Sequence, residues 1–243
     1  VDKDDQTINC LVESMRSQGL TVDQTDGLGC YVIDVPNDWE DYVQQRSKSG
    51  RREIRQSLKN VEDGLIKVRK VRDEEGLESS WSQFVDLHQR RRHSSGTTGC
   101  FDHPPFGTFL RSAASELLKA GLLELVIASV DDVPVAAQFA LVDNDCWYFY
   151  QSGMNQDASE LRPGMSVFCH ALRETIEAGR KRIDMMRGDE PYKLRWRAEL
   201  LPAQEVRVCS PRNMAQMRNQ VYSAGVTFKN LVKSIGVGQP TKA

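Results

Sequence analysis

The stretch that decides the fold reads Leu123-Glu-Leu-Val-Ile-Ala-Ser-Val-Asp-Asp-Val-Pro-Val-Ala-Ala-Gln-Phe-Ala-Leu-Val-Asp-Asn-Asp-Cys-Trp-Tyr-Phe-Tyr-Gln-Ser152. Three apolar runs of strand length are separated by two short acidic segments. Aspartate and asparagine favour turns because their short side chains hydrogen-bond the local backbone. We therefore predict three antiparallel strands, which are Leu123–Val130, Val133–Val142 and Cys146–Ser152.

Helical patterns lie on both sides of these strands. The most regular one repeats apolar residues at three- and four-residue spacing from Phe106 to Leu118 and stops at Gly121. Further helices are predicted at Thr7–Leu20, from Asp38 toward the basic segment Lys48–Lys59, and at Ser79–Arg92, Pro163–Gly179 and Asn213–Ile235; further strands are predicted at Cys30–Val35, Leu65–Val71 and Arg182–Met186. This order predicts an α+β fold with a mixed, mostly antiparallel central sheet, helices on both faces and a long C-terminal amphipathic helix.

Composition limits the classes of function. The chain has 243 residues, of which 40% are hydrophobic and 27% charged, so it is long enough to bury a core. Its net charge is -2, which gives no overall attraction to DNA or to an anionic membrane. No apolar run approaches the roughly 20 residues that span a bilayer, and we expect a soluble, cytoplasmic protein. The six cysteines form no C-x-x-C pair, so free thiols and no metal are expected.

The segment Asp184–Trp196 concentrates reactive side chains. It contains a carboxylate, guanidinium groups, a phenol and an amine directly after a predicted helix and strand. If the chain bends at Gly188, Arg187 and Lys193 approach one cleft from either side. There they would hold a phosphate, a carboxylate or a developing oxyanion, which predicts a group-transfer site.

Two other basic groups and one helix start have more than one interpretation. Arg51, Arg52, Arg55 and Lys59 form either a solvated helix face or an anion site. The run Arg90–Arg92 suits the macrodipole at a helix C-terminus, and together with Arg51–Lys59 it would also permit binding of tRNA. The helix that follows Pro163-Gly164 begins with unpartnered amide groups, which is a general cradle for anions.

The sequence resembles one family by the order of its motifs between Trp39 and Val208. It resembles the GNAT-type acetyltransferase domain of CelD-like proteins of cellulose biosynthesis, which are related to Fem-type peptidyltransferases. The motifs are Trp39, Tyr42 and Arg51-Arg52-Glu-Ile-Arg55; Leu87-His88-Gln-Arg-Arg91; Gly99-Cys-Phe101; Val135-Ala-Ala137; Tyr148-Phe-Tyr-Gln-Ser-Gly153; Arg162-Pro-Gly164; and Asp184-Met-Met-Arg-Gly188 with Tyr192-Lys-Leu-Arg-Trp196.

The resemblance implies an acyl group carried by acetyl-CoA or another acyl-CoA and delivered beside the strand Cys146–Gly153. A backbone N–H near Ser152 or Gly153 would polarise the acyl carbonyl, and the pyrophosphate would sit at the helix start. The implied cofactor-binding residues are Ser152, Gly153, Arg162, Gly164, Met165 and Ser166. The chain departs from the family pattern at Leu161, where glutamine or arginine is usual.

Four residues are the candidate catalytic groups. Lys193 matches a lysine that Fem-type relatives place beside the acyl carbonyl, although a pairing with Asp184, Asp189 or Glu190 would also explain it. Asp184 is the candidate general base, or the partner of an arginine in a salt bridge. Tyr150 or Tyr192 would protonate the leaving group, unless each is a packed tyrosine. The candidate substrate-binding residues are Arg52, His88, Arg91 and Arg187, with His88 also fitting a core histidine.

The resemblance also implies a division of the chain. Residues 1–36 would be the tail of a preceding GNAT-like half, 37–64 a connecting basic helix, 65–209 the acyltransferase domain, and 210–243 a helix and tail. Because the chain starts at Val1, we expect it to be part of something longer. The C-terminal helix would allow a homodimer.

Three functions fit these observations. The first is an acyltransferase that moves an acyl group from acyl-CoA to an amine or hydroxyl of a small molecule or glycan, in polysaccharide or cell-envelope metabolism. The second is a Fem-type transferase that takes its acyl group from charged tRNA. The third is a non-catalytic module in an envelope-synthesis complex.

Overall fold

The computed structural model describes residues 1–188 and 190–234, which form two compact units. Unit 2 is Cys30–Leu200, and unit 1 combines Val1–Gly29 with the described residues after Leu200. The division passes through two long strands, β1 (Thr21–Asp34) and β7 (Glu199–Cys209), so each strand contributes to both units.

Unit 2 is built on a sheet whose strand order is β2-β3-β4-β5-β6-β1-β7. The strands are β2 (Lys67–Lys70), β3 (Leu123–Val130), β4 (Val133–Val142), β5 (Cys146–Met154) and β6 (Arg182–Arg187), followed by the ends of β1 and β7. Neighbouring strands from β2 to β5 are antiparallel, as are β6 and β1, whereas β5 and β6 run parallel. The three predicted strands of the meander are confirmed as β3, β4 and β5.

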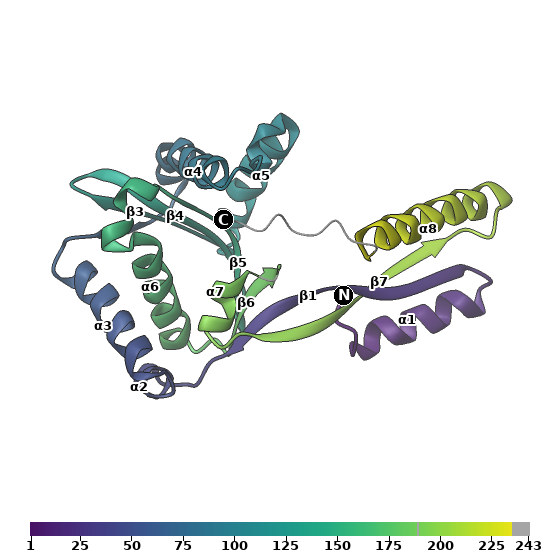
Figure 1. The fold of residues 1–243 in the computed structure, drawn as a ribbon, viewed down its shortest axis with the longest axis horizontal. Coiled ribbons are helices and arrows are strands. Elements are labelled where there is room, and N and C mark those ends of the chain that lie inside the picture. Colours follow the sequence, from purple (N-terminus) through teal and green to yellow (C-terminus); the bar gives the residue numbers. More distant parts are fainter. Residues whose placement is uncertain (189, 235–243) are drawn as a thin grey trace. The chain divides into compact units, whose positions relative to one another are not determined.

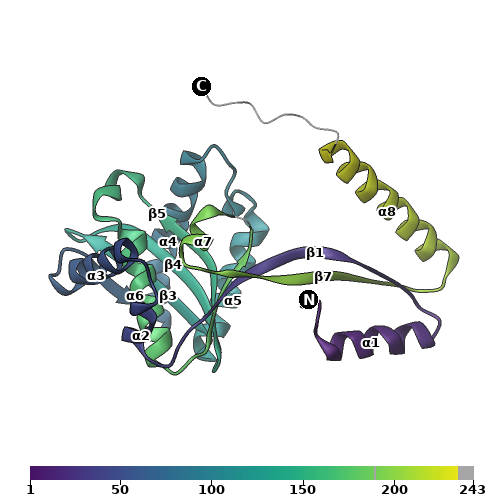
Figure 2. The ribbon, with the colours of Figure 1, turned by 60° about the horizontal axis from the view of Figure 1, so that its bottom comes forward.

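Helices cover both faces of this sheet (Figures 1 and 2). One face is packed by α4 (Glu74–Ser94) and α5 (Pro104–Lys119), and the other by α6 (Pro163–Glu177), which is backed by α3 (Lys48–Glu62) and α2 (Trp39–Gln44). Short helices complete the unit: η1 (Cys100–Asp102), η2 (Gln156–Leu161) and α7 (Pro191–Arg195). The predicted α+β architecture, with a mixed and mostly antiparallel sheet between helices, is confirmed.

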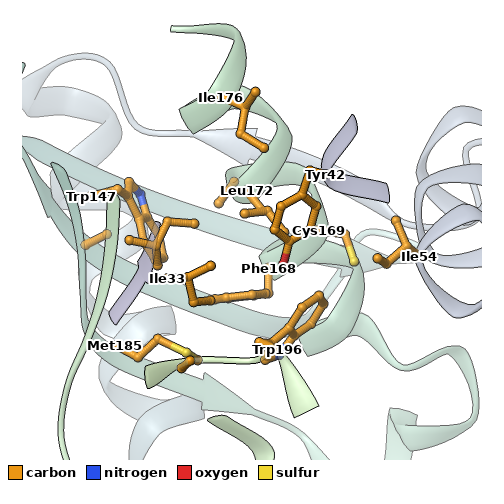
Figure 3. Close-up of a cluster of buried hydrophobic side chains, with 14 of the residues drawn as sticks. Ile33, Tyr42, Ile54, Trp147, Phe168, Cys169, Leu172, Ile176, Met185 and Trp196 are labelled. Atoms are coloured by element: carbon orange, nitrogen blue, oxygen red, sulfur yellow. The ribbon is translucent and has the colours of Figure 1, made fainter. Parts of the chain in front are cut away.

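Each face of the sheet has its own apolar core. Beneath α4 and α5, Phe84 and Leu87 pack against Phe139 and Leu125 of the sheet. On the other face, Phe168 and Leu172 of α6 meet Trp147, and the cluster extends to Tyr42 and Trp196 (Figure 3). The two cores hold β5 from both sides and so fix the strand on which the candidate site is built.

One helix expectation and one strand expectation needed correction, and two elements were not predicted. The helix expected from Asp38 into the basic segment is two helices, because Ser47 starts α3 by accepting a hydrogen bond from the Gly50 amide. The strand expected at Cys30–Val35 begins much earlier, at Thr21, and β7 and α7 were not predicted. In the segment after Gly188, Pro191–Arg195 forms the short helix α7.

Unit 1 consists of α1 (Gln6–Ser17), the first part of β1, most of β7, and α8 (Asn213–Ser234). The helix expected at Asn213–Ile235 is confirmed up to Ser234, and Ile235 lies outside the described residues. Val12 is the only described hydrophobic residue of this unit that is buried. Within the described residues, no helix has the length and apolar character to cross a membrane.

Candidate functional site

The site is built where two parallel strands separate. β5 and β6 are paired only at their first three positions, from Cys146 with Arg182 to Tyr148 with Asp184. Beyond Tyr148, β5 keeps its partner β4 on one edge, whereas its other edge has no strand partner among the described residues. Tyr150 is an extra residue on β5, since Phe149 faces Ala140 and Gln151 faces Phe139. Such a bulge increases twist and redirects side chains. The splayed strands leave backbone groups of β5 available to a ligand.

Gly153 fixes the position of α4 against this strand. A Cβ atom at Gly153 would lie 2.3 Å from the backbone nitrogen of His88 and 2.4 Å from the backbone carbonyl carbon of Leu87. Only glycine allows α4 and β5 to come this close. The contact brings the last two turns of α4, which carry Arg91 and Arg92, to the open edge of β5.

The N-terminus of α6 faces the same opening. Its N-cap residue, Arg162, has a left-handed backbone conformation with φ of 50°, and no side chain caps the helix. The first turn of α6 contains no acidic residue, and Pro163 occupies a position that needs no N–H. The amides of Met165 and Ser166 donate to the Arg162 carbonyl at 2.9 and 3.1 Å, so the Gly164 amide and the positive end of the helix dipole offer an anion site.

Two adjoining cavities occupy the opening. The first compartment, of about 520 Å³, lies beside α6 and is lined mainly by apolar residues, including Met154, Met165, Phe168 and Trp196, together with Gly153 and Gly164. The second compartment, of about 570 Å³, lies beside β6 and is lined by Arg92, Tyr150, Gln151, Arg187, Glu190 and Lys193, among others. Arg91, Ser95, Phe149, Ser152 and Tyr192 line both compartments, so these five residues form the junction.

Lys193 lines the second compartment but is only 1% exposed. Its Nζ donates to the carbonyl oxygens of Met186, Arg187 and Gly188 at 3.1, 2.8 and 3.0 Å. It also lies 2.9 Å from Oε2 of Glu190. The three carbonyls converge because the backbone curls at Met186 and Gly188, where φ is 59° and 109°. The ammonium group is therefore fully used by the chain itself in this conformation, and it holds the turn that carries Arg187.

Tyr192 and Tyr150 retain their phenolic protons at neutral pH. Burial raises the pKa of Tyr192 to about 12, helped by the charge of Glu190 and opposed by Arg91 and Arg92. Burial also raises the pKa of Tyr150. Because Tyr192 lies at the junction of the compartments, it is the better placed of the two proton donors.

Asp184 does not line either compartment. Its Oδ1 accepts a hydrogen bond of 2.7 Å from the Met186 amide, and the described residues give it no salt bridge to Arg187 or Arg195. Burial raises the pKa of its carboxyl group. The structure places Asp184 as a support of the turn at Met186.

The remaining predicted residues divide between the site and its surroundings. Ser152, Gly153, Gly164, Met165, Arg91 and Arg187 line one or both compartments. Arg52 and Arg162 line a different groove beside α3, and Arg162 pairs with Glu53 at 3.1 Å. His88 is buried, with its Nε2 3.0 Å from Oε1 of Gln151, and Ser166 is fully buried in α6. The structure thus does not bring these four side chains into the cleft.

Sequence reasoning missed several lining residues. Arg92 was considered only as part of the basic run Arg90–Arg92, and Phe149 and Gln151 only as members of the motif Tyr148–Gly153. The signal for Arg92 was its position next to Arg91 in the last turn of α4. Glu190 is one of the three pairing partners that the sequence offers for Lys193, and the structure shows this local pair at 2.9 Å.

The comparisons with known proteins bear on this geometry. The family described as "Acetyltransferase (GNAT) domain" matches residues 48–194. No protein with a curated description matches the chain.

Solved structures share the fold at low sequence identity. FemX is 11% identical with a TM-score of 0.62, over 83% of this chain and 68% of FemX. A conserved protein of unknown function from Bacteroides thetaiotaomicron is 10% identical, with a TM-score of 0.56 over 84% of this chain and 67% of that protein. The C-terminal domain of a putative lysylphosphatidylglycerol synthetase from Agrobacterium fabrum is 12% identical, with a TM-score of 0.53 over 87% of this chain and 69% of that domain.

Proposed function

The chain belongs to the acetyltransferase (GNAT) domain family, and from that premise we propose that it transfers an acyl group from an acyl-CoA to an amine or hydroxyl acceptor. One observation carries the proposal. The uncapped start of α6 and the unpaired edge of β5 open on the same compartment. One end of that compartment suits a phosphate group, and its wall suits an extended chain with amide groups.

The residues of the first compartment fit an acyl-CoA. Gly164 would place its amide and the start of α6 against the pyrophosphate, where the helix dipole favours negative charge. The free edge of β5 would pair with the amides of the pantetheine arm, and Phe168 and Trp196 would cover its apolar parts. The bound thioester supplies an activated acyl group. Leu161 does not weaken this fit, because the cradle is formed by backbone amides.

The chain's own groups supply polarisation and a proton. Backbone N–H groups of β5 near Ser152 and Gly153 would stabilise negative charge on an acyl oxygen. Tyr192, with its pKa raised to about 12, keeps its proton at neutral pH and would donate it to the leaving CoA thiolate as the C–S bond breaks. The phenolate so formed would take up the proton that the acceptor's amine or hydroxyl loses when it bonds to the acyl carbon. Lys193 has its donors committed to three carbonyls, so we assign it to holding the turn rather than to contact with the acyl group.

The acceptor and its pathway rest on the resemblance. The motifs shared with CelD-like proteins favour a small molecule or glycan in polysaccharide or cell-envelope metabolism. A second candidate, transfer from charged tRNA, is favoured by the arginines at the second compartment, since guanidinium groups bind phosphate.

Thermal stability with saturating acetyl-CoA and longer acyl-CoAs tests the proposal. Specific binding raises Tm, because a ligand at a free concentration of 100 times its Kd adds about 2.7 kcal/mol to the free energy of unfolding. A Gly164→Asp variant should lose this rise, because the carboxylate would oppose the phosphate at the helix start. Thr108→Asp is the matched control, since it adds the same charge to an exposed position near the start of α5.

The outcomes separate the two candidates. A rise that survives Gly164→Asp would show that acyl-CoA binds elsewhere and would refute the proposed site. No rise with any acyl-CoA in a folded sample, together with salt-sensitive binding of charged tRNA, would favour the second candidate.

A further inference from the structure

The second compartment has the chemistry of an anion site. We propose that it binds the acceptor through a phosphate or carboxylate group on that acceptor, held by Arg91, Arg92 and Arg187. The inference rests on the proposed acyl transfer and names the class of acceptor.

The three guanidinium groups come from two directions. Arg91 and Arg92 lie in the last turn of α4, and Arg187 ends β6 across the opening. Arg91 is hydrogen-bonded to the hydroxyl of Ser152, whereas Arg92 and Arg187 are exposed. Within residues 1–188 and 190–234, neither Arg92 nor Arg187 forms a salt bridge with a carboxylate. Guanidinium groups converging from two sides bind a phosphate or carboxylate in a defined orientation.

The opposing charge in this compartment is already matched. Glu190 supplies the one carboxylate among its described lining residues, and that carboxylate lies 2.9 Å from Nζ of Lys193. The charge of Arg92 also acts on Glu190, where it favours the ionised form of the carboxyl group. Lys193 and Glu190 thus balance each other, and the charge of the three arginines remains for a ligand.

The difference in lining between the two compartments indicates which of them binds the carrier and which binds the acceptor. The first compartment is mainly apolar and suits the carrier, whereas neutral polar groups in the second, such as Gln151 and Ser95, would bind the hydroxyl groups of an acceptor. The whole chain has a net charge of -2, so its positive charge here is local and not a general property of the surface. An anionic group held by the arginines would leave the acceptor's amine or hydroxyl directed toward Tyr192 at the junction.

The test is calorimetric binding of four probes to the full chain at constant ionic strength. The probes are glucose 6-phosphate, glucuronate, inorganic phosphate and neutral glucose. We expect the anionic sugars to bind and glucose to bind at least tenfold more weakly, and comparison of the first two identifies phosphate or carboxylate as the preferred group. Arg92→Gln and Arg187→Gln should each weaken the preferred probe by about tenfold or more, the scale of one charge-assisted hydrogen bond.

Arg90→Gln is the matched control because Arg90 adjoins these residues but pairs with Asp86 at 2.8 Å and is not among the lining residues. An equal loss in Arg90→Gln and Arg92→Gln, equal binding of glucose and its phosphate, or binding of inorganic phosphate alone would overturn the inference. Acyl-CoA binding is measured on the same variants. Retained acyl-CoA binding without anionic-probe binding refutes only the inference, and absent acyl-CoA binding refutes the proposed function.

Discussion

Replacing Lys193 with alanine separates a structural from a chemical role for this residue. Lys193 is 1% exposed, and its ammonium group donates to three backbone carbonyls beside Glu190. Lys193→Ala leaves these carbonyls without their donor, whereas the carboxylate of Glu190, whose side chain is 51% exposed, can be hydrated. The turn that carries Arg187 would then lose its internal support.

The expected loss of stability is large. Hydrogen bonds to a charged group contribute about 1.5–3 kcal/mol each, but the four contacts share one ammonium and their energies do not add. A buried acceptor left without a donor costs about 1–3 kcal/mol, and for three carbonyls that lose one shared donor we take about 4 kcal/mol. For a domain of this size each kcal/mol lowers Tm by roughly 2–4 °C, which gives a decrease of roughly 8–16 °C.

Thermal unfolding followed by circular dichroism measures this decrease. Lys193→Met keeps the apolar stem and removes only the charge, so it should be nearly as unstable as the alanine variant. Lys181→Ala is the control: Lys181 is exposed and pairs with Asp145, a surface ion pair that contributes about 0–1 kcal/mol. A Tm of Lys193→Ala within about 2 °C of the unmodified chain, with acyl transfer abolished, would refute the structural role and place Lys193 in the chemistry.

Three other predictions follow from burial and close contact. Gly153→Ala should destabilise the chain by about 1–3 kcal/mol in urea unfolding, because a Cβ would lie 2.3 Å from the His88 nitrogen; Gly107→Ala, with its nearest contact at 3.6 Å, should have no such effect. Burial raises the pKa of Tyr42 to about 12, so the folded state keeps a proton that the unfolded chain loses near pH 10. The stabilisation that comes from this difference in the pKa of Tyr42 is fully present below about pH 10 and is lost as the pH rises to about 12. Tyr42→Phe should reduce that alkaline loss and should not lower Tm at neutral pH, because the buried hydroxyl has no hydrogen-bond partner among the described residues; a lower Tm would contradict the reasoning. Tyr192→Phe should slow acyl transfer roughly 10²-fold or more while acyl-CoA binding is retained, and an unchanged rate would exclude Tyr192 as the proton donor.

Local patterns predicted the elements whose structure is set locally. The meander followed from apolar runs between aspartate turns, and α5 followed from its regular spacing. β7 was missed because Pro202 and the charged residues Glu205 and Arg207 interrupt an apolar pattern. Its strand structure depends on pairing with a distant part of the chain, which the sequence alone does not reveal.

The candidate site was predictable in composition but not in arrangement. The concentration of reactive groups from Asp184 to Trp196 correctly marked one wall of a cleft. The burial of Lys193 was not foreseen, because it depends on the left-handed backbone at Met186, an uncommon conformation for a residue with a side chain. The sequence likewise indicated Gly153, but the reason for a glycine there lies in α4, more than sixty residues away.

The contact between Gly153 and α4 also determines where this protein can vary. There is no space for a methyl group between α4 and β5 at Gly153, so amino-acid substitutions on the α4 side of β5 would disturb the packing of unit 2. Arg92 and Ser95, at the exposed end of α4, carry no such restriction. Laboratory selection for a new acceptor would therefore gain most from a library at these two positions, with Gly153 held constant.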